Sequence, residues 1–137
     1  VAVVYWSSTG NTEAMAQAVV EGAKHAGAEA ELFTAAEFDG GKMDEFDAVA
    51  FGCPAMGAEE LEDGEFAPMF ETCESKLSGK KIALFGSYGW GDGEWMRTWE
   101  ENCRDKGANL VCDSVICQET PDDEALSACR SLGEALA

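Results

Sequence analysis

The residues best suited to chemistry form one short polar loop near the start of the chain: Ser7, Ser8, Thr9, Gly10, Asn11 and Thr12. An apolar run over residues 1–6 predicts a buried strand before the loop, and the apolar spacing over residues 13–20 predicts a helix after it. The first N–H groups of a helix lack intrahelical partners and carry partial positive charge, so they attract anions. The hydroxyl and amide side chains add further donors. This strand–loop–helix unit favours a phosphate, held by neutral donors because residues 1–20 include no Lys or Arg.

The simpler alternative is that these side chains only cap a helix, as Ser, Thr and Asn often do. The loop lacks the GxxxxGK[ST] spacing and the lysine of a P-loop, and it does not match GxGxxG. It also lacks the Cys and Arg that frame a phosphatase loop of similar architecture. The loop therefore predicts phosphate binding without specifying a reaction.

Length and composition predict one domain over residues 1–137, large enough to bury a core. The 46% hydrophobic and 26% charged content is typical of a soluble globular protein. No run approaches the roughly 18 apolar residues of a membrane span, and no signal segment opens the chain. Residue 1 already has strand character, so we expect at most an initiator Met to precede it.

Charge separates this chain from most domains of its size. It has 27 acidic and 9 basic residues, a net charge of −18. Such a surface repels nucleic acid and anionic membranes and favours partners with basic patches, although acidity for solubility alone is the alternative.

The six cysteines contain no CxxC pair, and His25 is the only histidine, so the sequence predicts neither a zinc nor an iron–sulfur site. A chain of this length folds without disulfides, which favours a reducing cytoplasm. We expect His25 at the surface near the end of the first helix.

Short apolar segments alternate with helical patterns along the whole chain. The predicted strands are residues 1–6, 28–34, 46–53, 80–86 and 109–117. The first helix is predicted from residue 13 to a stop at Gly27. Further helices are predicted over residues 66–77, 94–106 and 122–136, and Pro121 is predicted to open the last of them. Residues 35–45 are predicted as loop or irregular helix, broken by two glycines. This alternation predicts a parallel sheet covered on both faces, in order 2-1-3-4-5. The ligand of such a sheet lies beyond the strand ends, at the switch between strands 1 and 3.

That topology brings together three loops: residues 7–12, 54–61 and 87–93. In the third, Trp90 stands between glycines, where a Trp suits stacking on a flat ligand, with half-buried packing as the alternative. In the second, Met56 is a polarizable contact for an aromatic ring, or else core filler, and Gly57 permits unusual backbone conformations. Trp95 and Trp99, by contrast, have helical spacing and are predicted to pack in the core. A ligand with a phosphate tail and a planar tricycle fits these three loops, and FMN is such a ligand.

Three stretches carry a resemblance to a known family: VYWSSTGNTEAMA, FGCPAMGAEELED and LFGSYGWGDGEWM. Through them the chain resembles the short-chain flavodoxins of clostridia and rumen anaerobes, over essentially all 137 residues. The resemblance implies an α/β, flavodoxin-like three-layer sandwich with a five-stranded parallel sheet. It also implies FMN as the cofactor, with no catalytic or metal-binding residues.

The resemblance also implies a role for each loop. The phosphate of FMN is expected on residues 7–12, Met56 and Trp90 flank the isoalloxazine ring, and the Gly57 peptide faces flavin N5. Glu59 accepts from flavin N3, and the backbone of residues 87–91 lies near the N1/O2 edge. The cofactor-binding residues so implied are Ser7, Ser8, Thr9, Gly10, Asn11, Thr12, Pro54, Ala55, Met56, Gly57, Ala58, Glu59, Ser87, Tyr88, Gly89, Trp90 and Gly91.

Two positions depart from the family pattern. Ser8 stands where the family commonly has Gly, and it would cost roughly 1 kcal/mol if that position needs a positive φ. Gln118 and Glu119 stand where some relatives place an Asn near the flavin.

The implied function is a low-potential one-electron carrier whose non-covalently bound FMN cycles between semiquinone and hydroquinone. A Gly57 carbonyl turned toward N5 would favour the semiquinone, while the −18 charge disfavours the anionic hydroquinone and lowers its potential. We expect a monomer whose partners are ferredoxin-type proteins, reductases and oxidoreductases with basic docking patches. The alternative is an FMN-dependent reductase of quinones or disulfides, for which the chain has no spare length. A phosphate-accepting receiver domain would need an Asp where Cys53 and Pro54 stand.

Overall fold

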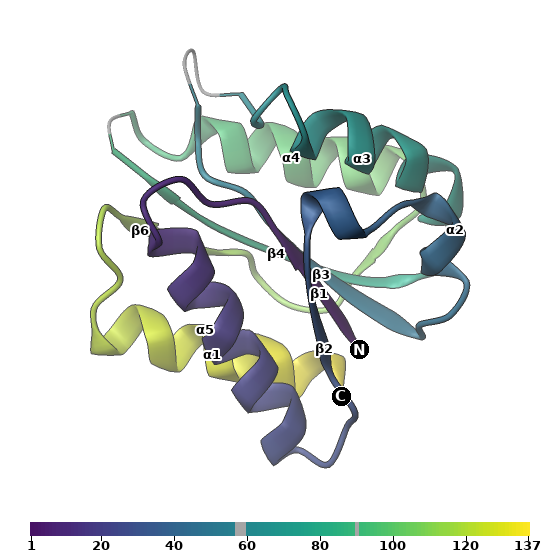
Figure 1. Cartoon of the computed structure of the whole chain (residues 1–137), viewed down its shortest axis with the longest axis horizontal. Helices are drawn as coiled ribbons and strands as arrows, with labels where there is room; N and C mark the ends of the chain where they lie inside the picture. The colour runs from purple at the N-terminus through teal and green to yellow at the C-terminus, as the bar shows by residue number, and fades with distance from the viewer. Residues whose placement is uncertain (57–59, 90) are drawn as a thin grey trace.

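The computed structural model describes residues 1–56, 60–89 and 91–137 and shows a three-layer α/β fold (Figure 1). The strands are β1 (Ala2–Tyr5), β2 (Glu31–Thr34), β3 (Ala48–Gly52), β4 (Lys81–Tyr88), β5 (Asn109–Leu110) and β6 (Val115–Gln118). The helices are α1 (Asn11–His25), α2 (Gly40–Met43), α3 (Phe66–Cys73), α4 (Glu94–Asp105) and α5 (Asp123–Leu136), with 3-10 turns η1 (Ala35–Glu37) and η2 (Glu74–Lys76).

The sheet is parallel, in the predicted order 2-1-3-4-5, but its outer position holds two strands in place of one. Both β5 and β6 pair with β4: Ile82 lies beside Leu110, and Phe85 lies beside Val115. Only two residues of β4, 83 and 84, therefore lie opposite the four residues 111–114, so the segment between β5 and β6 forms a bulge. The predicted single strand over residues 109–117 is wrong for this reason. At the bulge, the Ser114 hydroxyl donates a hydrogen bond to the carboxylate of Glu100 in α4 at 2.8 Å.

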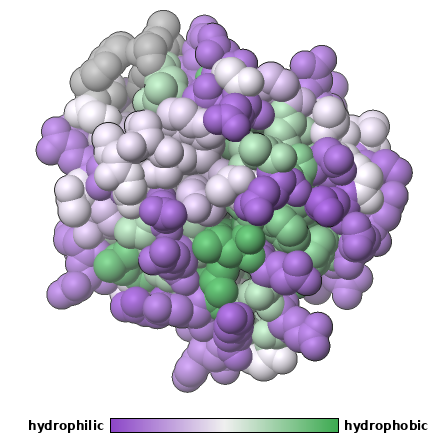
Figure 2. Space-filling model, in the orientation of Figure 1, coloured by the Kyte–Doolittle hydropathy of each residue, from purple (hydrophilic) through white to green (hydrophobic). Residues whose placement is uncertain are grey.

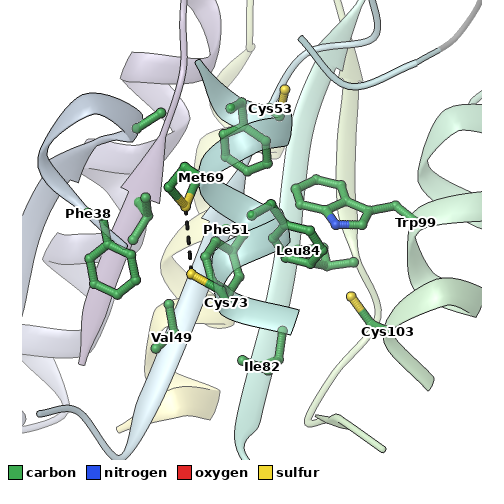
Figure 3. Close-up of a cluster of buried hydrophobic side chains, with 14 of the residues drawn as sticks. Phe38, Val49, Phe51, Cys53, Met69, Cys73, Ile82, Leu84, Trp99 and Cys103 are labelled. Carbon is green, nitrogen blue, oxygen red and sulfur yellow. Dashed lines mark hydrogen bonds between the residues drawn. The ribbon is translucent and has the colours of Figure 1, made fainter. Parts of the chain in front are cut away.

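Helices cover both faces of the sheet, with α1 and α5 on one side and α3 and α4 on the other (Figure 1). The α3–α4 side contains an aromatic core in which Phe51, Phe66, Phe70 and Trp99 meet mostly edge to face. Figure 3 shows Trp99 reaching from α4 toward Leu84 of the sheet. Trp95 and Trp99 are 2% and 3% exposed, which confirms the prediction that both pack in the core.

On the other side, α1 and α5 cross in close contact because two glycines face the neighbouring backbone. A Cβ on Gly22 would overlap the carbonyl of Arg130, and a Cβ on Gly133 would overlap the carbonyl of Val19. A glycine is needed at each position so that the helices can approach this closely.

Other element boundaries differ from the predictions by a few residues. The second strand begins at residue 31, and the predicted helix over residues 66–77 ends in the 3-10 turn η2. The two glycines predicted to break residues 35–45 begin α2, whose N-terminus is capped by Asp39. Pro121 does not open α5, which begins at Asp123. The residue that caps the helix is Asp122, whose side chain accepts from the N–H of Ala125. Gly27, with φ of 92°, follows the end of α1 as predicted, and His25 is exposed at that end.

Hydrophilic side chains cover most of the face seen in Figure 2, with small hydrophobic patches between them. Among the described residues, no helix combines the length and apolar character needed to cross a membrane.

Candidate functional site

Backbone hydrogen bonds continue past the ends of the strands and hold the three predicted loops side by side. The N–H of Trp6 donates to the carbonyl of Gly52 at 3.0 Å, which joins the first loop to the end of β3. The N–H of Ala55 donates to the carbonyl of Ser87, also at 3.0 Å, which joins the second loop to the end of β4. The loops therefore meet at the switch between β1 and β3, as the topology predicts.

The first loop ends at Gly10, because Asn11 and Thr12, which were predicted as loop residues, are the first residues of α1 and present free N–H donors there. Gly10 occupies the N-cap position with φ of 92°, a conformation that favours glycine, and no side chain of the described residues caps the helix. Its own N–H donates to the Ser7 hydroxyl at 3.1 Å, and its carbonyl accepts from Ala14. Within the described parts of the chain, the N–H groups of Asn11 and Thr12 have no hydrogen-bond acceptor. These donors lie at the positive end of the helix dipole, which suits a phosphate.

A buried pair of hydroxyls links this loop to the third. Thr12 Oγ1 lies 3.0 Å from Ser87 Oγ, and the two residues are 1% and 5% exposed. Ser87 belongs to β4, which extends through Tyr88; the prediction that both residues are loop is therefore wrong. When Ser87 donates to Thr12, the Thr12 proton is free to donate to a ligand at the helix N-terminus.

A polar cavity of about 330 Å³ lies beside the first loop, lined by Ser7, Ser8 and Gly10 together with residues 34–36. Two carboxylates in its wall are already engaged: Glu65 accepts from the indole of Trp6 at 3.3 Å, and Glu13 accepts from the Tyr5 hydroxyl at 2.9 Å. Burial and the bond to Glu13 raise the pKa of Tyr5 above its ordinary value. Tyr5 thus remains a neutral donor that holds the Glu13 carboxylate.

The second loop is fixed at both ends. Met56 and Glu60 exchange two backbone hydrogen bonds, of 2.8 and 2.9 Å, and the segment between them, Gly57, Ala58 and Glu59, lies outside the described residues. The roles predicted for these three residues stay predictions. Pro54, Ala55 and Met56 are each partly buried at the start of the loop.

Glu62, which the sequence analysis did not single out, anchors the far end of this loop. Its carboxylate accepts from the N–H groups of Gly64, Glu65 and Phe66 at 2.7, 2.7 and 2.8 Å, and so caps α3. Burial alone would raise the pKa of Glu62, but these three bonds lower it below the ordinary value. The only sequence signal for this role is an acid just ahead of a predicted helix.

Cys53 follows β3 and is buried beneath the second loop. Its sulfur accepts from the N–H of Glu62 at 3.4 Å, and burial raises the pKa of the thiol to about 12. A thiol that stays protonated at neutral pH is a poor nucleophile, so Cys53 packs as a small apolar side chain. All six cysteines are free, and the described residues hold no cluster of three or more His, Cys, Asp or Glu side chains able to bind a metal.

The third loop begins where β4 ends. Tyr88 packs against Trp95 at a centroid distance of 5.5 Å, and Gly91 has a φ of 87°. Trp90 lies outside the described residues, so its predicted stacking role stays a prediction. Gly89 is exposed, and its carbonyl accepts from the Gln118 side chain at 3.3 Å.

The two positions that depart from the family pattern have different outcomes. Ser8 does not adopt a positive φ, so the strain considered for it does not arise. Glu119 does, with φ of 58°, while its N–H donates to the carbonyl of Tyr88 at 2.7 Å. Gln118 and Glu119 thus lie against the third loop, next to the site.

The residues present fit FMN at its phosphate end. Uncapped N–H groups at a helix N-terminus and the hydroxyls of Ser7 and Thr12 together supply several donors for a phosphate ester. Chain neighbours aside, a Cβ placed on Gly10 or Gly89 would meet no atom of the described residues within 4 Å.

A model of the family described as flavodoxin matches residues 3–133. The chain belongs to the flavodoxin family. It is 46% identical to the flavodoxin of Megasphaera elsdenii over 140 residues, covering 100% of this chain and 98% of the relative. It is 43% identical to the flavodoxin of Clostridium beijerinckii over 135 residues, covering 98% and 97%. The solution structure of two-electron reduced M. elsdenii flavodoxin aligns with a TM-score of 0.90 at 45% identity, covering 98% of this chain and 96% of that one.

These similarities confirm the predicted family and the predicted function at its coarser level. This flavodoxin is an FMN-binding electron carrier, an electron-transfer protein rather than an enzyme. The alternative, a flavin-dependent reductase of quinones or disulfides, is not favoured.

Proposed function

We propose that this flavodoxin is a low-potential one-electron carrier whose FMN phosphate binds at the N-terminus of α1. The observation that carries the proposal is the set of uncapped N–H groups on Asn11 and Thr12, beside the Ser7 hydroxyl. FMN supplies the electron chemistry at its isoalloxazine ring, and the protein sets its affinity and potential.

The chain's own residues then have three tasks. The neutral donors of the first loop bind the phosphate, while Tyr5 holds the Glu13 carboxylate by a 2.9 Å hydrogen bond. Met56 and Trp90 exclude water from the ring, and residues 87–91 line its polar edge. The peptide at Gly57 and the carboxylate of Glu59 would orient the ring by hydrogen bonds.

A low potential follows from charge. The chain carries −18, and the described residues that line the first loop and its cavity include two carboxylates and no Lys or Arg. A further electron placed near these groups is raised in free energy, because the local field is negative and no cation among these lining residues offsets it.

We propose further that the protein acts as a monomer in the cytoplasm and docks on basic patches of ferredoxin-type partners, reductases and oxidoreductases. The support is the acidic surface, since opposite charges steer encounter between partners.

The test combines binding and kinetics. Apoprotein should quench the fluorescence of FMN at micromolar concentration but bind riboflavin and FAD much less tightly. Electron transfer from the reduced protein to a basic cytochrome c should slow as salt rises toward physiological ionic strength. A protein that binds riboflavin as tightly as FMN would contradict the phosphate site, and a rate that stays flat with salt would contradict acidic docking.

A further inference from the structure

A groove of about 540 Å³ lies between residues 60–63, at the end of the second loop, and helix α4. Its floor is apolar and comes from Leu61, Ala67, Trp95 and Trp99. The indole N–H of Trp99 is buried and has no acceptor among the described residues. Polar groups on α4 complete the wall.

The rim of this groove carries charge of one sign. Four exposed carboxylates border it, from Glu60, Asp63, Glu101 and Asp105, and none of the described residues that line it is Lys or Arg. None of the four takes part in an ion pair with another residue that the structure describes. An apolar floor inside a ring of unpaired acids is complementary to an apolar side chain flanked by cations.

We propose that this groove is a docking site for a basic segment of a protein redox partner, which inserts an apolar side chain between Leu61 and α4 and places Lys or Arg on the rim. The proposal rests on the proposed function, because it assigns a place on the surface to the partner of an electron carrier. A second copy of this chain is a poor occupant, since two surfaces of −18 repel each other. The apolar insertion supplies affinity, and the rim charges supply orientation and on-rate.

The position of the groove suits electron transfer. Glu60 on its rim exchanges two backbone hydrogen bonds with Met56, the residue predicted to contact the flavin ring. A partner seated in the groove therefore lies against the second flavin loop, and docking there brings its own redox centre toward the same end of the sheet.

The test uses FMN-loaded, ¹⁵N-labelled protein and the peptide acetyl-Lys-Lys-Leu-Lys-Lys-amide as the probe. NMR titration should shift the indole signals of Trp95 and Trp99 and the amide of Ala67. The same peptide with Ser in place of Leu should bind at least fivefold more weakly. Equal affinity of the two peptides would overturn the apolar part of the proposal.

A pair of matched variants tests the rim. Asp105→Lys and Glu134→Lys both place a lysine near the C-terminal end of a helix, where a cation is favourable, and both change the charge by the same amount. Asp105→Lys, on the groove, should weaken peptide binding at least fivefold, and Glu134→Lys, on α5 across the sheet, less than twofold. Equal weakening of peptide binding by the two variants would indicate diffuse attraction to an acidic protein and would overturn the proposed docking site.

Ala67→Phe fills the floor without changing charge, and it should remove the preference for the leucine peptide. FMN affinity separates the two proposals: an unmodified protein that does not bind FMN would contradict the proposed function, whereas a variant that loses peptide binding and retains FMN concerns the groove alone. If dilution of the protein without peptide shifts the same signals, the occupant is a second copy, and the partner proposal is wrong.

Discussion

The hydroxyl pair between Thr12 and Ser87 should couple the stability of the fold to FMN affinity. Thr12→Val keeps the shape of the side chain but leaves the Ser87 hydroxyl buried without this partner. An unsatisfied buried hydroxyl costs about 1–3 kcal/mol, whereas removing both groups is close to neutral. Thr12→Val and Ser87→Ala should therefore each lower the free energy of unfolding, and the double variant should recover about 1–2 kcal/mol relative to their sum.

The affinity for FMN should respond differently to the loss of each of the two hydroxyls. If the Thr12 hydroxyl donates to the phosphate, its loss removes a hydrogen bond to a charged group, worth about 1.5–3 kcal/mol, or roughly 10–150-fold in Kd. Ser87→Ala removes only the group that orients this hydroxyl, so its effect on Kd should be smaller.

The assays are urea unfolding of the apoprotein, followed by far-UV circular dichroism, and titration of FMN by fluorescence quenching. Thr98→Val is the matched control, because it makes the same change at an exposed position of α4. It should shift stability by no more than about 0.5 kcal/mol and leave FMN affinity unchanged. Additive effects on unfolding would refute the buried pair, and a Kd for Thr12→Val within twofold of wild type would refute the phosphate contact.

Three further predictions concern stability. Gly133→Ala should lower the free energy of unfolding by about 1–3 kcal/mol, although Ala favours helices, because its Cβ would overlap the carbonyl of Val19. Trp95→Phe should cost more than Trp99→Phe, since the Trp95 indole donates a buried hydrogen bond of 3.2 Å and the Trp99 indole has no acceptor among the described residues. Burial raises the pKa of the Cys103 thiol to about 12, whereas a thiol in the unfolded chain ionises near 8.5. The free energy of unfolding should therefore fall as the pH rises above about 8.5. Cys103→Ala should make that fall less steep.

Urea unfolding measures all three, at pH 7.5 for the first two and from pH 7.5 to 9.5 for the third. Ser131→Ala, exposed on the same helix as Gly133, is the control for the glycine and should be neutral or slightly stabilising. A Gly133→Ala protein as stable as wild type would contradict the close helix crossing. Equal costs for the two Trp variants would contradict the role of the indole bond, and an unchanged pH slope in Cys103→Ala would contradict the buried thiol.

The sequence was sufficient to predict the sheet order and the meeting of the three loops. Fully buried strands such as β1 and β3 appear as continuous apolar runs, and helices between them force parallel pairing. It was not sufficient for the outer position, where β5 and β6 replace one predicted strand. Within the described part of the chain, each of these strands pairs only with β4, and β6 alternates between partly buried and exposed residues. The apolar pattern over residues 109–117 therefore cannot reveal a bulge that depends on pairing with β4.

Within the site, local signals identified the loops but not the contacts between them. Thr12 and Ser87 lie 75 positions apart, so their hydrogen bond is a product of the topology and not of any motif. Glu62 likewise caps a helix through three N–H bonds that no periodicity predicts.

Glu119 shows how tertiary contacts can override a local preference beside the site. A glutamate with φ of 58° costs about 1–2 kcal/mol relative to an ordinary conformation, and Asn or Gly tolerates this region better. The conformation persists because the N–H of Glu119 donates to Tyr88 at 2.7 Å and the neighbouring Gln118 side chain donates to Gly89 at 3.3 Å. These bonds fasten β6 to the start of the third loop. The strain at Glu119 is therefore offset by contacts to Tyr88 and Gly89, the two residues that precede the predicted ring-stacking Trp90 in the sequence.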